Sequence, residues 1–234
     1  MSSQLATVFL ERGDVRGQEL ALLLDLKTDD IQDAPDEWHL TIEHGKLALR
    51  QSDGNLFTFS FEDIRNRVEN ARWSAIAKAC ASVRRPKVLD ALGGWGLDAI
   101  ILSMAGCRVT VTEASPIVCA VAKNLAREAN TPLAFTCGFV EDYLNTSGEL
   151  FDVVYLDPIF PQHPKGARPS RRMQILHSLA KTDSDLRAVF EIAKKHALNR
   201  VVVKHRRNQP TLFGAPHWQI TSKTVRFDIY RASA

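Results

Sequence analysis

The amino-acid sequence predicts an α/β protein with a mostly parallel sheet, an antiparallel pair of strands at the C-terminus and a small β-rich subdomain at the N-terminus. Short apolar runs alternate with helix-like segments from residue 87 onward, and this alternation is typical of a parallel sheet covered by helices. Turn signals separate shorter strand-like runs in residues 38–61. A length of 234 residues accommodates one large domain with a small appendage.

The N-terminal β-rich subdomain is predicted to span residues 1–63. Residues 5–27 mix apolar and polar positions without a clear period. In residues 38–61 apolar positions alternate with polar ones, and turn signals stand at His44-Gly45 and Asp53-Gly54. We therefore expect a small antiparallel sheet in this part of the chain.

The larger domain is predicted to span residues 64–234 and to begin with a helix over residues 64–82, where apolar side chains recur at helical spacing. Apolar runs of strand length follow at 87–92, 108–113, 133–137, 152–157, 200–205, 217–222 and 225–232. Helices are expected between these runs, at 97–105, from Pro116 onward, shortly after 137 and at 183–197. The last two strands form the antiparallel pair.

The apolar runs, the N-terminus and the cysteines indicate the cellular location of the protein and the kinds of site that we expect in it. No apolar run is long enough to span a membrane, and the N-terminus has no signal-peptide pattern, so we expect a cytoplasmic protein without a membrane partner. The cysteines stand singly in apolar surroundings and form no CxxC pair, which argues against a zinc site and against a disulfide framework. We expect all four to be reduced, and we expect no metal. They are Cys80, Cys107, Cys119 and Cys137.

The net charge of +3 is unevenly distributed along the chain. Residues 1–60 contain eleven Asp and Glu but five Lys and Arg, whereas residues 158–227 contain three acids and fourteen basic residues. A basic C-terminal half is typical of a protein that binds a polyanion, although a solvated basic face without a partner has the same composition.

A glycine-rich segment, DALGGWGLDA at residues 90–99, follows the first strand of the larger domain. Gly94 and Gly96 permit a tight turn and close approach of the backbone to a ligand. Glu113 ends the next strand, where an acid can bind the ribose hydroxyls of a nucleoside. The segment also matches the dinucleotide pattern GxGxxA. However, Asp90 would repel a pyrophosphate, whereas it would attract a cationic amino-acid group.

The segment DVVYLDPIFPQ at residues 152–162 ends a buried strand in an acid, two prolines and an aromatic ring. Proline donates no hydrogen bond to a sheet, so the prolines end the strand and stiffen the residues that follow it. Ligands bind at the carboxyl edge of open α/β sheets. Asp157 and Phe160 are therefore predicted to face a ligand.

These motifs together resemble the RsmJ family of bacterial small-subunit ribosomal RNA guanine-N2 methyltransferases. Four blocks occur in the family's order: VLDALGGWGLDAIILSMAGCRVTVTEASP, VVYLDPIFP, RVVVK and RFDIY. The resemblance extends from about Trp38 to Tyr230. It implies a Rossmann-like class I methyltransferase fold, S-adenosylmethionine as the cofactor, and methylation of the exocyclic N2 amine of a guanosine in small-subunit (16S) ribosomal RNA, either free or in the assembled subunit.

The resemblance also implies which positions contact the cofactor. Together with Asp90, Gly94 and Gly96, they are Leu97, Asp98, Glu113, Ala114, Phe139, Val140 and Asp157. The family more often has Arg or Ser where this chain has Leu97, Ala114, Phe139 and Val140, so we expect backbone contacts there and an apolar wall for the adenine from Phe139 and Val140. Residues 61–73 also depart from the family, because they lack its glycines.

Methyl transfer to an exocyclic amine explains the acid and the ring. Guanine N2 is a poor nucleophile because its lone pair is delocalised, so the enzyme must align the amine with an activated methyl group. Asp157 and the Pro158 carbonyl are predicted to accept hydrogen bonds from the amine as positive charge develops on it. Phe160 is predicted to stack on a base that is unpaired or flipped out of its helix.

Basic residues beside this segment are predicted to hold RNA phosphates, because such contacts dominate nucleic-acid affinity. The segment HPKGARPSRRMQ at residues 163–174 is predicted to be a basic loop, and the strand at 200–205 ends at the same edge of the sheet. The predicted RNA-binding residues are Lys165, Arg168, Arg171, Arg172, Lys204 and Arg206.

Three other functions share parts of this pattern. An Asp-Pro-x-Phe segment also serves methylation of adenine N6 or cytosine N4 in other RNA or DNA. The GxGxxA match is compatible with a nicotinamide-dependent oxidoreductase. The unusual residues at Leu97, Phe139 and Val140 are compatible with a non-catalytic RNA-binding protein that keeps a methyltransferase fold.

Overall fold

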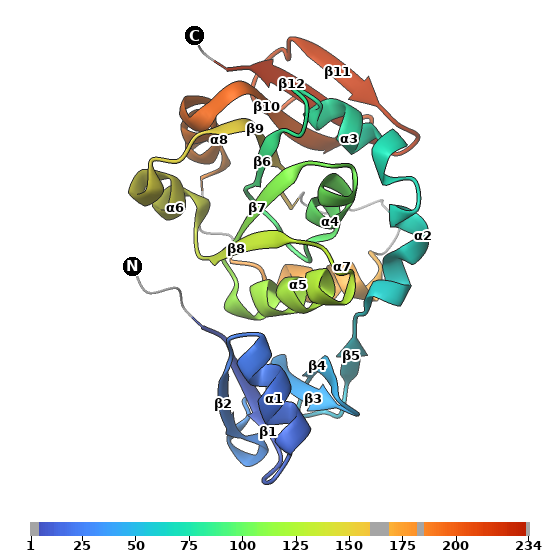
Figure 1. The fold of residues 1–234 in the computed structure, drawn as a ribbon, viewed down its shortest axis with the longest axis vertical. Coiled ribbons are helices and arrows are strands. Elements are labelled where there is room, and N and C mark those ends of the chain that lie inside the picture. Colours follow the sequence, from blue (N-terminus) through green and yellow to red (C-terminus); the bar gives the residue numbers. More distant parts are fainter. Residues whose placement is uncertain (1–4, 160–168, 182–184, 233–234) are drawn as a thin grey trace.

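The computed structural model describes residues 5–159, 169–181 and 185–232. Within these residues the chain forms two sheets, one of five strands in the order β2-β1-β3-β4-β5 and one of seven in the order β11-β12-β10-β9-β6-β7-β8. Figure 1 shows the smaller, N-terminal sheet below the larger one, with the segment that contains α2 leading from one to the other.

The antiparallel sheet that we expected over residues 38–61 is confirmed, but two strands that we did not predict, from residues 7–30, extend it in parallel and make the whole sheet mixed. Its elements are β1 (Thr7–Leu10), α1 (Val15–Leu23), β2 (Lys27–Asp30), the 3₁₀ turn Ile31–Asp33, β3 (His39–Glu43), β4 (Lys46–Arg50) and β5 (Leu56–Thr58). Strands β3, β4 and β5 are antiparallel, but β1 pairs parallel with both β2 and β3. The reason is α1, which returns the chain to the starting edge of the sheet, as a parallel crossover requires.

The segment that joins the two sheets is a series of short turns, and not the single helix that we predicted over residues 64–82. It consists of the 3₁₀ turn Phe61–Ile64, α2 (Arg65–Val68), the 3₁₀ turn Ala71–Trp73 and α3 (Ala75–Cys80). Ser74 interrupts the helix because its backbone is extended, with ψ of 153°, and its hydroxyl caps α3 by accepting a hydrogen bond from the backbone of Ala77 at 3.2 Å.

The larger sheet confirms the predicted architecture. Its elements are β6 (Lys87–Asp90), α4 (Leu97–Met104), β7 (Arg108–Glu113), α5 (Pro116–Glu128), β8 (Leu133–Cys137), α6 (Val140–Ser147), β9 (Phe151–Leu156), α7 (Arg171–Leu179), α8 (Leu186–His196), β10 (Ala197–Arg206), β11 (Trp218–Thr221) and β12 (Val225–Arg231). Strands β8, β7, β6, β9 and β10 are parallel, and β12 and β11 are antiparallel additions at one edge. Helices α6 and α8 pack on one face of the sheet, and α3 and α4 on the other.

Helix α7 was not predicted, because we expected residues 163–174 to form a loop. Its first residue is Arg171, and Ser170 caps it by accepting a hydrogen bond from the backbone of Met173 at 3.4 Å. The predicted residues Phe160, Lys165 and Arg168 lie outside the described residues.

Aromatic packing joins the two sheets. The ring of Trp95, which follows β6, lies 6.2 Å from Phe57 and 6.0 Å from Phe59, measured between ring centroids. The backbone N–H of Phe61 donates a hydrogen bond of 2.9 Å to the Glu128 carboxylate at the end of α5. The predicted domain boundary between residues 63 and 64 stays a prediction. It falls between the N-terminal sheet and the larger sheet, which these contacts join.

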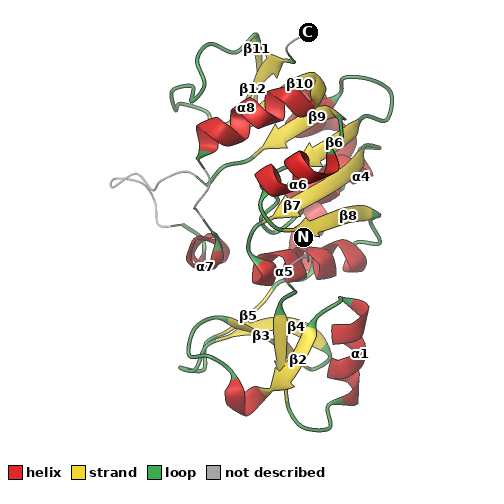
Figure 2. Ribbon diagram, turned by 90° about the vertical axis from the view of Figure 1, so that its left-hand side faces the viewer, coloured by secondary structure: helices red, strands yellow, loops and turns green. Residues whose placement is uncertain are grey.

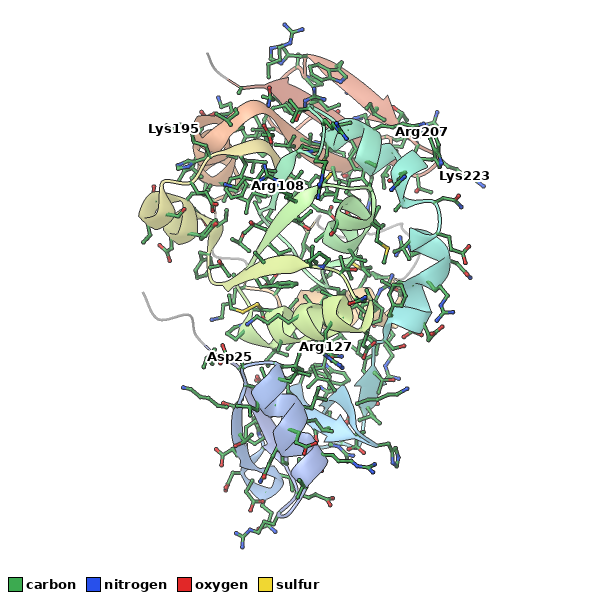
Figure 3. The ribbon with its side chains drawn as sticks, in the orientation of Figure 1. Asp25, Arg108, Arg127, Lys195, Arg207 and Lys223 are labelled. Atoms are coloured by element: carbon green, nitrogen blue, oxygen red, sulfur yellow. A yellow bond between two sulfur atoms is a disulfide. The ribbon has the colours of Figure 1, made fainter. Side chains whose placement is uncertain are left out.

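The structure contains a disulfide between Cys119 in α5 and Cys137 at the end of β8, with their Cα atoms 5.8 Å apart (Figure 3). Our expectation of four reduced cysteines was therefore wrong for this pair. The two positions are 18 residues apart in sequence, and they meet because α5 packs against β8. Cys80 and Cys107 are free thiols.

Candidate functional site

A cavity of about 640 Å³ opens at the carboxyl edge of the larger sheet. This volume is typical of a small-molecule site. Strand β6 pairs with β7 on one side and with β9 on the other, so the chain order reverses at β6, which is where open α/β sheets bind ligands. In Figure 2 the carboxyl ends of these strands and helix α7 lie on the same side of the molecule.

The glycine loop after β6 lies tightly against its neighbours. A Cβ atom on Gly93 would come within 2.3 Å of Val111 in β7, and one on Gly96 within 3.2 Å of Ala122 in α5. Gly94 and Gly96 have φ of +50° and +75°, which glycine adopts without strain. Close packing therefore requires glycine at Gly93, a position that we did not single out. The positive φ angles favour glycine at Gly94 and Gly96.

Glu113, at the end of β7, ties this loop to its own strand. One carboxylate oxygen accepts a hydrogen bond from the backbone N–H of Gly94 at 2.8 Å, and the other accepts one from Ser115 at 2.8 Å. Burial raises the pKa of Glu113, and these backbone hydrogen bonds oppose the rise. The structure therefore brings Glu113 and the glycine loop together at the cavity, and the ribose contact of Glu113 stays a prediction.

Asp90 is almost completely buried at the end of β6, and its Oδ1 atom has no hydrogen-bond partner within the part of the chain that the structure describes. Burial and then the nearby Asp98 carboxylate raise its pKa well above the usual value. A buried carboxylate oxygen without a partner is costly, so a donor from a ligand would be favourable at this position. A cation is the ligand group that fits best.

Asp157 belongs to a chain of four hydrogen-bonded side chains. The ammonium group of Lys204, in β10, donates hydrogen bonds of 2.7 Å to Asp157 Oδ2 and 2.7 Å to Asp98 Oδ2. The Tyr155 hydroxyl donates a further bond of 2.5 Å to Asp98 Oδ2. The chain crosses β9, β10 and the first turn of α4, and it therefore connects the Asp-Pro segment with the glycine-loop helix.

Comparison with known proteins identifies the family. Residues 23–232 match the model of the SAM_MT family, which describes S-adenosylmethionine (SAM)-dependent methyltransferases. The chain belongs to the SAM-dependent methyltransferase family. This assignment favours methyl transfer over the nicotinamide oxidoreductase alternative and makes SAM the cofactor of the site.

Individual relatives agree with the family. The methyltransferase is 32% identical to "Ribosomal RNA small subunit methyltransferase J" of Legionella pneumophila strain Philadelphia 1, over 95% of this chain and 92% of the relative. It is 33% identical to the protein of the same name from Cellvibrio japonicus, over 83% of each chain. Its fold is similar to the crystal structure of a SAM-dependent methyltransferase from Neisseria gonorrhoeae, with a TM-score of 0.71 and 25% identity over 97% of this chain and 96% of that one.

The cavity of the methyltransferase fits SAM in its chemistry. The buried Asp90 carboxylate, whose Oδ1 atom has no partner among the described residues, suits the cationic amino-acid end of the cofactor, and a carboxylate on the next strand suits ribose hydroxyls. Every predicted cofactor position except Gly96 lines the same cavity. Besides Asp90, they are Gly94, Leu97, Asp98, Glu113, Ala114, Phe139, Val140 and Asp157, together with Pro158 of the catalytic set. Gly96 stands at the N-terminus of α4.

Several cavity residues were missed by the sequence reasoning. Arg67, from the divergent segment 61–73, lines the cavity, and so do Met173, Leu176 and His177 of α7. The helical spacing of Met173, Leu176 and His177 was the signal that could have identified α7.

The predicted RNA-binding residues occupy different positions. Arg171 is exposed and donates a hydrogen bond to the Leu56 carbonyl at 3.2 Å, whereas the Arg172 guanidinium lies 4.9 Å from the centre of the Phe59 ring. Arg206 is exposed at the cavity. The Lys204 ammonium faces the two carboxylates described above. In the residues that the structure describes, no helix is long and apolar enough to cross a membrane. No cluster of metal-binding side chains occurs in the same residues.

Proposed function

We propose that this methyltransferase methylates the exocyclic N2 amine of a guanosine in small-subunit (16S) ribosomal RNA. The observation that carries the proposal is the placement of Asp157 and Pro158 beside the cofactor cavity, at the carboxyl end of β9. An acid and a backbone carbonyl at this point suit an exocyclic amine, and the relatives named above act, by name, on small-subunit ribosomal RNA. A ribosomal RNA substrate implies a cytoplasmic protein.

The cofactor would be held by three groups of residues. Asp90 would bind the ammonium group of the amino-acid end, and Glu113 the ribose hydroxyls. Phe139 and Val140 would form an apolar wall for the adenine. When bound, SAM supplies a methyl group that is already activated by its sulfonium.

The chain's own catalytic contribution is then positioning and electrostatic stabilisation. Asp157 and the Pro158 carbonyl would accept hydrogen bonds from the amine and stabilise the positive charge that develops on its nitrogen. Phe160, which lies outside the described residues, would stack on the base. A base inside a helix cannot reach this site, so the target nucleotide must be unpaired or flipped out.

The RNA would be held by basic side chains around the cavity. Arg171, Arg172 and Arg206 come from α7 and the end of β10, and Lys165 and Arg168 come from the undescribed segment that precedes α7. Phosphate contacts of this kind make binding fall as salt rises.

The experiment that tests the function is methyl transfer from labelled SAM to small ribosomal subunits and to free 16S RNA, both isolated without the modification. Digestion to nucleosides and mass spectrometry identify the product. We expect N2-methylguanosine, and we expect its loss with Asp157→Asn, a substitution that preserves shape but removes the charge. N6-methyladenosine or N4-methylcytidine as the product would overturn the guanine assignment.

A further inference from the structure

The strongest unexplained feature of the site is Lys204, which lies between two carboxylates. Its ammonium is 2.7 Å from Oδ2 of Asp157 and 2.7 Å from Oδ2 of Asp98, and its side chain is only 23% exposed. Strand β10 pairs in parallel with β9, with Val203 opposite Leu156, so Lys204, the next residue of β10, lies beside Asp157, which directly follows β9. The position of the lysine is thus set by the sheet and not by a flexible loop.

The contact engages the Oδ2 oxygen of the Asp157 carboxylate. Lys204 donates a hydrogen bond to this oxygen and thereby fixes the orientation of the carboxylate. A carboxylate that is fixed through one oxygen presents its second oxygen in a defined direction. That is the geometry that an acceptor for a substrate amine requires.

The electrostatic surroundings of Asp157 are otherwise unfavourable to its charge. Burial raises the pKa of Asp157 to about 6, and the Asp98 carboxylate adds to the rise, whereas Lys204 lowers it. Several other charged or titratable groups line the cavity or act on these carboxyls from neighbouring elements. They are Arg67 from α2, Asp90 from β6, Glu113 from β7, Tyr155 from β9, Arg172 and His177 from α7, Lys181 after α7, and His205 and Arg206 from β10.

We propose that Lys204 is a positioning residue that keeps Asp157 ionised and aimed at the substrate amine, and that it joins Asp157 to Asp98 in the helix that follows the glycine loop. This role replaces the RNA-phosphate contact that the sequence suggested for Lys204. It rests on the proposed function, because it assumes that Asp157 accepts a hydrogen bond from the amine.

Loss of the Lys204 ammonium should raise the pKa of Asp157. Burial and Asp98 would remain, and both favour the protonated form of Asp157, so the pKa of Asp157 would rise further. A protonated carboxyl carries an O–H donor and is a weaker acceptor. Methyl transfer by the wild-type protein should therefore decline as pH falls through about 6, and the decline should begin at higher pH when the ammonium is absent.

The test compares Lys204→Met and Lys204→Arg with a matched control, Lys195→Met, which removes an exposed lysine on α8 (Figure 3). The acid limb of the pH–rate profile should move up by about one unit or more in Lys204→Met. It should stay near the wild-type position in Lys204→Arg and in the control. A rate that falls equally at every pH in Lys204→Met would overturn the proposal.

A second readout needs neither substrate nor cofactor. Carboxyl carbon signals of labelled aspartate, assigned with Asp157→Asn, report the titration of Asp157 by NMR in the free protein. We expect a higher Asp157 pKa in Lys204→Met and a nearly unchanged one in Lys204→Arg. An Asp157 pKa that is unchanged in Lys204→Met contradicts the proposal, even if N2-methylguanosine is the product. A wild-type protein that produces no N2-methylguanosine refutes the proposed function instead.

Discussion

Single carboxyl groups at strand ends organise the site. Asp90 ends β6, Glu113 ends β7 and Asp157 follows β9, and burial raises the pKa of each. A carboxyl group whose pKa is raised on folding destabilises the folded state as pH rises from its unfolded pKa to its folded pKa, and this cost persists above that range. Ligand groups that donate hydrogen bonds or carry positive charge can offset the cost, which favours binding of a cationic, hydroxyl-bearing cofactor.

A substitution of Glu113 tests whether these buried carboxyl groups bind the cofactor. Glu113→Ala should weaken SAM binding by about 1–3 kcal/mol, the cost of losing a buried hydrogen-bonding partner. Isothermal titration calorimetry measures the change, with Glu19→Ala on the exposed side of α1 as the control. An affinity equal to that of the wild-type protein would mean that the ribose lies elsewhere.

Helix α7 shows how one secondary-structure element brings two kinds of side chain to the cavity. Met173 and Leu176 line it with apolar surface, and the first turn carries the adjacent arginines 171 and 172. The Arg172 guanidinium packs over Phe59 of the N-terminal part of the chain, and burial lowers its pKa. The helix therefore presents positive charge at the junction of the two sheets.

Replacement of both arginines should separate RNA binding from cofactor binding. In the variant Arg171→Gln/Arg172→Gln, the slope of log affinity against log salt should become shallower by about 1–2, because two phosphate contacts are lost. The control variant Arg187→Gln/Lys195→Gln removes the same charge from exposed positions on α8. Binding of small-subunit RNA at several salt concentrations gives the slopes, and equal slopes for the double variant and the wild-type protein would place the RNA on another face.

The disulfide between α5 and β8 should determine how many cysteines can be alkylated. It links Cys119 to Cys137, directly before the loop at Gly138 and Phe139 that lines the cavity. Alkylation of the denatured protein without reductant should label two cysteines, and prior reduction should raise the number to four. Mass spectrometry counts the labels. Four labels without reductant would show that the two thiols are not bonded.

The two sheets share buried contacts at the scale of the whole molecule. One hydrophobic cluster includes Val8, Leu40 and Leu49 of the N-terminal sheet together with Ile100 of α4 and Leu125 of α5. A shared cluster couples the stability of the two parts, because opening the junction exposes apolar surface on both sides. The cavity, which α2 and α7 help to line, therefore depends on how the N-terminal part is packed.

Trp95 is the residue that tests this coupling, because it is 3% exposed and contacts Phe57 and Phe59 across the junction. Trp95→Ala should reduce the free energy of unfolding by about 3–5 kcal/mol. Trp73→Ala is the matched control, since Trp73 is 76% exposed, and its effect should stay within about 0.5 kcal/mol. Denaturant titrations followed by circular dichroism measure both, and a small effect of Trp95→Ala would argue against coupling.

Much of the site could be predicted from the sequence because its residues stand next to the strands that position them. Asp90, Glu113 and Asp157 are adjacent to apolar runs whose parallel pairing brings their carboxyl ends to one edge. Gly94 and Gly96 were equally visible, since a short loop between a strand and a helix allows few conformations, whereas the close packing of Gly93 against β7 was not. The larger sheet and its antiparallel edge followed from the alternation of local patterns.

Only the tertiary structure decided which residues meet across long stretches of chain. Lys204 and Asp98 are 106 positions apart, and a basic residue near the end of a strand suits an RNA phosphate as well as it suits two carboxylates. Ser74 splits a helix that periodicity alone would continue, and β1, α1 and β2 add two parallel strands to the antiparallel sheet expected over residues 38–61. Local sequence determines which backbone conformations are favourable, whereas side-chain partners depend on packing between segments that the local pattern does not encode.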